Sequence, residues 1–277
     1  MLTDEIIAAF GEWLESEEKS RNTVEKYLRD VRAFAVRCEG REICKQTVID
    51  YKQGLIDSNY AVRSINSMLA SVNCLLGWLG LPELCVKSLR VQNQVFCPEE
   101  RELTKAEYER LCRTAKRRNN EGLYLILQTI CGTGIRVSEL GFITVEAVQS
   151  GQATVSLKGK TRTVIIVSEL REKLLRYIAK RKLVTGTVFT SKNGMPISRT
   201  SVWRMMKSLC REAAVDPAKV FPHNLRHLFA RVFYSLEKDI AKLADILGHS
   251  SINTTRIYIA TTVSEHRKFM ENMRLII

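Results

Sequence analysis

The sequence predicts a mainly α-helical protein with one small β-sheet, divided into two domains. Apolar residues recur at helical spacing along most of the 277 residues, and a single β-branched stretch alternates like a hairpin. The helical periodicity fades between Leu81 and Arg101, where Pro82 and Pro98 stand. We therefore expect a helical domain at residues 1–90, a linker at 91–102 and a larger α+β domain at 103–277.

The charge changes at the same boundary. Residues 1–100 contain 12 Lys and Arg against 15 Asp and Glu, whereas residues 101–277 contain 31 against 15. The second part therefore has a net charge of +16, which suits contact with a polyanion such as DNA. Charge alone is compatible with many proteins, so it supports a nucleic-acid partner without establishing one.

The composition is typical of a folded protein of the cytoplasm. Hydrophobic residues make up 45% of the chain, no apolar run reaches membrane-spanning length, and the N-terminus lacks a signal-peptide pattern. The eight cysteines show no CxxC pair and no Cys/His cluster with zinc spacing. We expect reduced cysteines and no bound metal.

Four helices are predicted in the first domain. Thr3 is a suitable N-cap for the first, and the second begins near Asn22, where Glu25 completes a capping pattern. Two further helices are expected at 45–56 and 61–79. The second helix offers a basic side, made of Arg21, Lys26, Arg29 and Arg32.

The second domain opens with Thr104 and Glu107, which match a capping box. An apolar helix at 124–131 ends at a Gly-Thr-Gly turn, and another helix begins at Ile135. Arg136 at this corner stands between two apolar residues. We expect it to be partly buried, with Glu139 one turn later as its partner.

A hairpin follows, with strands at 154–157 and 163–167 around a tight turn at Lys158-Gly159-Lys160. Beyond it we expect a basic helix at 170–182, a short strand at Val188-Phe189 and an amphipathic helix at 201–214. The basic residues available to DNA phosphates here are Lys160, Arg199, Arg204 and Lys207.

The stretch from 221 to 260 contains four groups suited to a phosphodiester: His223, Arg226, His249 and Tyr258. Arginine matches the charge of the non-bridging oxygens, histidine can move a proton near neutral pH, and a tyrosine hydroxyl can act as a covalent nucleophile. Each residue alone is more often structural, but four together indicate a site.

Three helical segments present these groups. Pro222 starts a helix whose buried face is predicted to consist of Leu225, Leu228, Phe229, Val232, Phe233 and Leu236. Asp239 caps a second helix that ends at Gly248, just before His249. Tyr258 follows on a short helical segment.

The sequence resembles the tyrosine recombinase, or phage integrase, family along nearly its whole length. The matching motifs are GTGIRVSEL around Arg136, LKGKTRTVIIV around Lys158, HNLRH from His223, and LGHSSINTTRIY ending at Tyr258. The resemblance implies a SAM-like helical DNA-binding domain and a recombinase catalytic domain with a C-terminal helix. This is the organisation of simple two-domain, Xer-like or mobile-element integrases.

The resemblance also implies a role for each site residue. Tyr258 is the nucleophile that attacks the scissile phosphate and forms a 3′-phosphotyrosine, leaving a free 5′-hydroxyl. Arg136 and Arg226 clamp the non-bridging oxygens, and His249 is a further donor to the phosphate.

Three more residues complete this implied set. His223 is the acid/base group near the nucleophile, and Lys158 protonates the departing 5′-oxygen, with Lys160 as the substitute if the register is shifted by two. Glu139 has a supporting role beside Arg136.

The same resemblance implies how the protein works with its partners. The energy of the broken phosphodiester bond is conserved in the covalent bond between the tyrosine and the DNA, so neither metal nor ATP is required. The expected partners are double-stranded recombination sites and three further copies of the chain, in a tetramer whose C-terminal helices are exchanged between neighbours. The sequence leaves open whether an accessory protein takes part.

Two alternatives keep the same scaffold: strand relaxation of the type IB topoisomerase kind, and DNA binding without catalysis. The apolar C-terminal tail argues against the first, and the presence of all six expected groups argues against the second. A metal-dependent nuclease is disfavoured because no carboxylate cluster accompanies the histidines.

Overall fold

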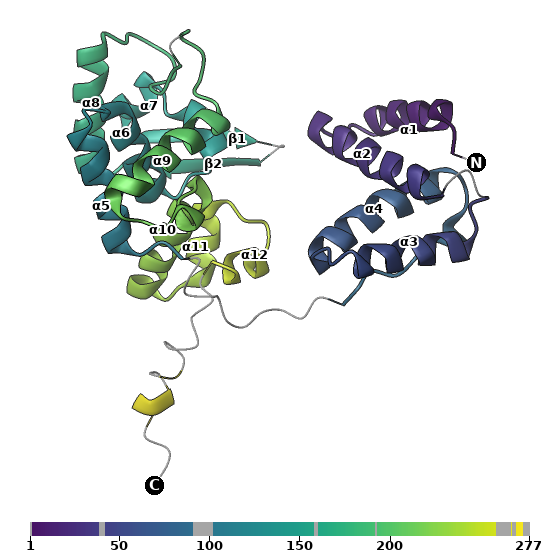
Figure 1. Ribbon diagram of the computed structural model, residues 1–277. Helices are drawn as coiled ribbons and strands as arrows, with labels where there is room; N and C mark the ends of the chain where they lie inside the picture. Colours follow the sequence, from purple (N-terminus) through teal and green to yellow (C-terminus); the bar gives the residue numbers. More distant parts are fainter. Residues whose placement is uncertain are drawn as a thin grey trace. The chain divides into compact units, whose positions relative to one another are not determined.

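The computed structural model describes residues 2–38, 42–90, 102–157, 160–191, 193–258, 267 and 270–273. These residues form mostly helices and one two-stranded sheet, which confirms the predicted fold class (Figure 1). The chain divides into two compact units, Met1–Asn93 and Gln94–Ile277. No helix in the described ranges is long and apolar enough to cross a membrane.

Three predicted features fall largely outside the described residues. They are the linker at 91–102, of which only Glu102 is described, the turn residue Lys158, and most of the C-terminal helix at 263–277.

The first unit consists of α1 (Asp4–Ser16), α2 (Arg21–Cys38), α3 (Lys45–Asp57), α4 (Val62–Trp78) and the short η1 (Pro82–Leu84). Thr3 caps α1 as predicted, its hydroxyl accepting from the Ile6 N–H at 3.3 Å. Helix α4 joins two apolar clusters. Leu75 packs with residues of α1 and α2, while Leu76 packs with residues of α2 and α3.

Helix α2 differs from the prediction at its start and along its basic side. It begins at Arg21, within one residue of the predicted start, but the Glu25 carboxylate that was expected to complete a capping pattern pairs with Arg21 at 2.9 Å. Lys26 is part of the unit's internal bonding, since its ammonium lies 2.9 Å from the buried Asp30 carboxylate, a charge that needs a partner. Arg21 and Arg29 remain exposed.

The second unit is built around α6 (Glu121–Thr133), which is buried on most sides by α5 (Lys105–Arg117), α8 (Ser168–Arg181) and α10 (Pro222–Glu237). Its remaining elements are η3 (Val137–Phe142), α7 (Val145–Ser150), α9 (Arg199–Ala213), η4 (Pro217–Lys219), α11 (Ile240–Leu247) and α12 (Ile252–Arg256). The capping box predicted at the start of α5 is present: the Glu107 carboxylate accepts from the Thr104 N–H at 2.8 Å, and the Thr104 hydroxyl accepts from the Glu107 N–H at 3.2 Å.

The hairpin pairs β1 (Gln152–Leu157) with β2 (Lys160–Ile165) in antiparallel register (Figure 1). Its second strand begins earlier than predicted, so Lys160 is the first residue of β2, opposite Leu157, rather than a turn residue. The buried face carries Val155 and, directly across from it, Arg162. An arginine therefore occupies an inward-facing position of the sheet.

Two other sequence predictions are wrong. Val188 and Phe189 form no strand; they are buried in a loop where the Val188 N–H donates to the Ile143 carbonyl, and only isolated bridges flank them. On α10, Val232 and Leu236 are 41% and 82% exposed instead of buried. The helical period is right, but the second half of α10 has less of the core to pack against.

Gly134 has a backbone conformation on which the later geometry depends. It ends α6 with φ +67°, and an added Cβ would lie 2.5 Å from the Phe229 ring. A side chain is therefore opposed both by the left-handed conformation and by the neighbouring ring.

We predict that Gly134→Ala lowers the free energy of unfolding of the second unit by roughly 2–5 kcal/mol, from left-handed strain and overpacking. Gly141→Ala is the matched control, because a Cβ at Gly141 meets nothing within 4 Å. Urea unfolding followed by circular dichroism measures both. Equal, small effects of the two substitutions would contradict this packing account.

Candidate active site

Arg136 follows the Gly134 turn and is the N-cap residue of η3 (Val137–Phe142), so the helix predicted to begin at Ile135 is a 3-10 helix that begins two residues later. The Glu139 carboxylate accepts from the Arg136 backbone N–H and from its guanidinium Nη1, both at 2.8 Å. The predicted partnership is therefore present, and it holds the guanidinium in one direction while the Arg136 side chain stays 38% exposed.

Glu139 is 1% exposed and bonds a second arginine, which sequence reasoning did not identify. Arg162 of β2 donates from Nη2 to Glu139 at 2.6 Å and from Nη1 to the Ile246 carbonyl of α11 at 2.7 Å. Burial lowers the Arg162 pKa, and the nearby Glu139 opposes that shift. The buried carboxylate thus connects η3 to the hairpin, and Arg162 in turn connects the hairpin to α11.

Arg226, in the second turn of α10, is fully buried. Its Nη1 donates to the Gly134 carbonyl at 2.5 Å, and its Nη2 donates to the Leu247 carbonyl at 2.7 Å. Both carbonyls lie at the carboxyl ends of helices, α6 and α11, where a cation is favoured. Burial, with Arg136 nearby, lowers the Arg226 pKa to about 10, so it keeps its charge at neutral pH.

His249 leaves the end of α11 and lies 2.9 Å from Arg226 Nη2 through its Nε2. Since a guanidinium only donates, Nε2 accepts and the proton is on Nδ1, which donates to the Thr255 hydroxyl at 2.8 Å. Burial, Arg226 and Arg136 lower the His249 pKa to about 4. The imidazole is therefore neutral at pH 7.

Tyr258 is buried just beyond α12, and its hydroxyl lies 3.0 Å from His223 Nε2. Loss of water around the imidazole, followed by the positive charges of Arg226 and Arg136, lowers the His223 pKa. A neutral His223 can accept a proton from the tyrosine at this distance. The Arg226 guanidinium carbon lies 5.8 Å from the centre of the same tyrosine ring.

A third histidine, His227, belongs to this cluster and was given no role from the sequence. Its ring is stacked on the Tyr258 ring, with centroids 4.1 Å apart and an interplanar angle of 20°. It also meets the His223 ring edge-on at 4.9 Å. The signal in the sequence was its position one helical turn after His223, which places both on the same face of α10.

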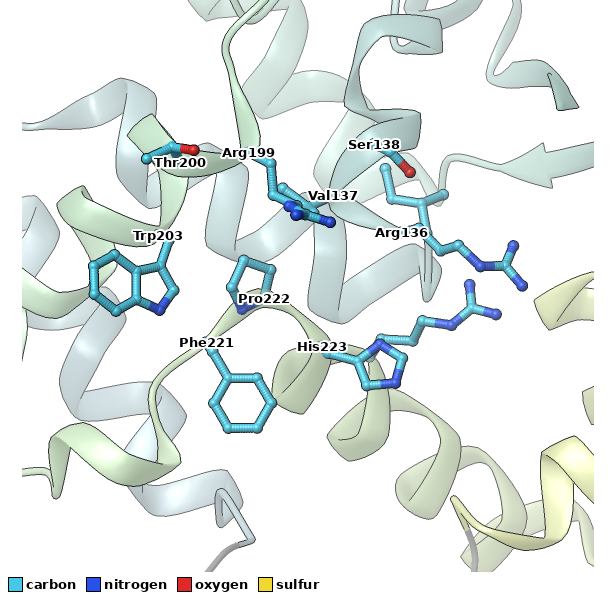
Figure 2. Close-up of a pocket in the computed structure, with 11 residues that line it drawn as sticks. Arg136, Val137, Ser138, Arg199, Thr200, Trp203, Phe221, Pro222 and His223 are labelled. Atoms are coloured by element: carbon cyan, nitrogen blue, oxygen red, sulfur yellow. The ribbon is translucent and has the colours of Figure 1, made fainter. Parts of the chain in front are cut away.

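A cavity of about 520 Å³ opens beside the cluster. Figure 2 shows Arg136 and His223 at one end of it and Trp203 with Thr200 at the other, with Phe221 and Pro222 between them. Arg199, one of the predicted DNA contacts, also lines this cavity. The site therefore has a cationic end and an apolar end.

Two other predicted DNA contacts, Arg204 and Lys207, do not line this cavity. Arg204 is exposed on α9, and Lys207 donates to the Pro217 carbonyl and lies 5.3 Å from the Trp203 ring centre. Lys160 is placed only by its backbone in β2, and Lys158 is not among the described residues. Within the described ranges, no group of three His, Cys, Asp or Glu residues could hold a metal ion.

Comparison with known proteins gives one consistent result. The model of the phage integrase family matches residues 101–265. Tyrosine recombinase XerA of Pyrococcus furiosus is 28% identical over 282 residues, which cover 99% of this chain and 96% of the relative. Tyrosine recombinase XerD of Halalkalibacterium halodurans is also 28% identical, over 90% of each chain.

The solved structures that resemble this chain include a recombinase and an integrase. A crystal structure of XerA recombinase is 26% identical, covers 100% of both chains and has a TM-score of 0.56. Lambda integrase(75-356), in a dimer bound to a COC′ core site, has a TM-score of 0.73 over 94% of this chain and 95% of its own. At 17% identity, this second likeness shows the fold alone.

We predict that Glu139→Gln lowers the free energy of unfolding by roughly 3–5 kcal/mol, because it leaves two arginines around a buried site without their counter-charge. Glu212→Gln is the matched control: its carboxylate also bonds two arginines, Arg117 and Arg118, but is 35% exposed. That substitution should change the free energy of unfolding far less, because solvent screens the exposed ion pairs. Similar losses in chemical denaturation would show that burial of the Glu139 carboxylate does not matter.

We also predict that the free energy of unfolding falls as the pH drops from about 6.5 toward 4. Burial and neighbouring cationic groups lower the pKa of His227 and of His249 to about 4. In this window the unfolded chain therefore binds protons that the folded protein does not.

His227→Phe, which keeps a flat ring but cannot titrate, is the comparison for this pH dependence. Its stability should depend less steeply on pH, by at most about 1.4 kcal/mol per pH unit for one proton. Urea unfolding at pH 7, 6 and 5 measures both slopes. Parallel slopes would contradict a lowered pKa at His227.

Proposed function

The chain belongs to the phage integrase family and is a tyrosine-type site-specific DNA recombinase, and we propose on that premise that Tyr258 is the residue that cuts and rejoins DNA. The observation that carries the proposal is the 3.0 Å contact between the Tyr258 hydroxyl and His223 Nε2, beside two arginines. This arrangement supplies a nucleophile, a base and cationic groups for one phosphate.

In the proposed first step, the Tyr258 oxygen bonds to phosphorus while the bond from phosphorus to the 5′-oxygen breaks. The tyrosine proton passes to His223 Nε2. The departing 5′-oxygen takes a proton from Lys158, leaving a 3′-phosphotyrosine and a free 5′-hydroxyl. In the reverse sense, the 5′-hydroxyl of a partner duplex attacks the phosphotyrosine, and the strands are exchanged without metal or ATP.

Arg136, Arg226 and His249 are proposed to stabilise the charge that gathers on the phosphate oxygens. Arg136 is oriented by Glu139 and keeps an exposed side at the cavity. Three of the five guanidinium donors of Arg226 are used by Gly134, Leu247 and His249, and its Nε has no partner among the described residues. Nε is thus one donor left for a phosphate oxygen.

Arg226 is buried but lines the cavity, and its guanidinium carbon lies 5.8 Å from the Tyr258 ring centre. A phosphate that meets Arg226 and Arg136 from the cavity would therefore also lie near the tyrosine. For His249 to donate to the phosphate from Nε2, that nitrogen must carry a proton in place of the bond it accepts from Arg226 in this structure.

The two units are proposed to act together on a DNA duplex, with residues 1–90 as the core DNA-binding domain and residues 103–277 as the catalytic domain. The net charge of +16 over residues 101–277 supports contact with phosphates. Glu139 serves as support for Arg136, and Lys160, Arg199, Arg204 and Lys207 are proposed DNA contacts.

The working assembly is proposed to be a homotetramer on two recombination sites, with C-terminal helices exchanged between neighbouring subunits. It is proposed to act in the cytoplasm, with or without an accessory protein. A structural relative, lambda integrase, is described as a tetramer bound to a Holliday junction, at 18% identity. The relatives' names give no support to strand relaxation or to DNA binding without catalysis.

We predict that Tyr258→Phe abolishes strand cleavage, by more than about 1,000-fold, because it removes the attacking oxygen while leaving the DNA-contacting cations in place. DNA affinity should stay within about 2-fold of the wild type. Tyr234→Phe, which removes a hydroxyl from a neighbouring aromatic of the same apolar cluster, is the control and should cleave normally. Cleavage by the Tyr258→Phe protein at the wild-type rate would place the nucleophile elsewhere.

A further inference from the structure

We propose that His227 is a positioning residue for the nucleophile: the face of its imidazole holds the Tyr258 ring so that the hydroxyl stays at His223. The inference rests on the proposed function, since it concerns how Tyr258 is aimed. It gives a part in the reaction to a histidine that the phosphate clamp and the proton transfers do not use.

The geometry places His227 against the flat side of the nucleophile. The two rings lie 4.1 Å apart at 20°, whereas the His223 ring meets Tyr258 at 5.3 Å and 67°, through its edge. His223 therefore contacts the hydroxyl end and His227 contacts the ring itself. Because His223 and His227 are four residues apart on α10, one rigid helix sets both contacts.

The backbone around Tyr258 provides less of this control. Tyr258 lies just beyond α12, a helix of five residues, and its N–H donates to the Thr255 carbonyl at 2.9 Å. A tyrosine hydroxyl stands at the far end of a long side chain, so a small rotation at the Cα end moves it by a large distance. A flat surface stacked on the ring restricts that rotation, and stacked aromatic pairs are favourable beyond their buried area.

His227 is suited to this task because it does not take part in proton exchange near neutral pH. Burial, with His223 and Arg226 close by, lowers its pKa to about 4, so its ring is neutral. Within the described part of the chain, its ring nitrogens make no hydrogen bond, so its contact with Tyr258 is through the ring face. A neutral ring also adds no positive charge that would repel Arg226.

Three substitutions separate positioning from simple filling of space. His227→Phe keeps a flat ring, His227→Leu keeps volume without a flat ring, and His227→Ala removes both. Each protein is first bound to the same nicked duplex, which carries the sequence that the wild-type protein selects from a random pool. The rate of covalent adduct formation in the bound complex is then measured, together with the Kd and the thermal unfolding midpoint.

We expect His227→Ala and His227→Leu to form the adduct about 10–100 times more slowly. A displacement of the nucleophile by about 1 Å lowers the reaction rate by up to about 100-fold. His227→Phe should remain within about 3-fold of the wild type, and Kd should change by less than about 2-fold in all three. Should His227→Ala be too unstable to study, the Leu and Phe proteins still give the comparison, because both fill the site.

A substrate with sulfur in place of the 5′-bridging oxygen identifies the step that is affected. Its thiolate leaves without a proton, so a defect in protonating the leaving group disappears on this substrate, whereas a defect in aiming Tyr258 remains. We expect the His227→Leu defect to remain.

Three results would overturn the inference. One is cleavage by His227→Leu at the wild-type rate, and another is a His227→Phe defect as large as that of His227→Leu, which would indicate a role for the ring nitrogens. The third is rescue of His227→Leu by the sulfur substrate. Failure of the wild-type protein itself to form an adduct at Tyr258 would instead overturn the proposed function, and this inference with it.

Discussion

The buried guanidinium of Arg226 is the interaction on which the rest of the site depends. It donates to the Gly134 carbonyl at the end of α6 and to the Leu247 carbonyl at the end of α11, and so joins two helices that are more than a hundred residues apart in the sequence. Each helix ends at a glycine with a left-handed backbone, Gly134 or Gly248. Two residues after the first glycine comes Arg136, and directly after the second comes His249. One cation therefore fixes the position of two other residues that are proposed to bind the phosphate.

The second constraint is the balance of charge. Arg136, Arg162 and Arg226 share this small volume with one buried carboxylate, Glu139, so the described site residues carry an excess of positive charge. Burial, together with that excess of positive charge, lowers the pKa of three histidines and favours their neutral forms. A neutral histidine can accept a proton at one ring nitrogen and donate from the other. The net positive charge of the arginines favours the binding of an anion. The electrostatics suit a site completed by a phosphate.

Much of this could be predicted from the sequence because its signals are local. The capping box at Thr104, the glycine after α6 and the pairing of Arg136 with Glu139 all depend on residues within a few positions of one another. Arg162 could not be assigned, because its partners Glu139 and Ile246 are 23 and 84 residues away. The exposure of Leu236 was missed for a similar reason: periodicity gives the apolar face of a helix but not the length over which a core covers it. The role proposed for His227 depends on a stacking partner 31 positions further along the chain, which no local pattern reveals.

The most direct test of the account is covalent trapping on a nicked duplex whose cleaved fragment diffuses away, followed by digestion and mass spectrometry of the DNA-linked peptide. The account predicts a single adduct, through a 3′-phosphate, on the peptide that contains Tyr258. An adduct on another residue, or none from a complex shown to bind the same DNA, would contradict it.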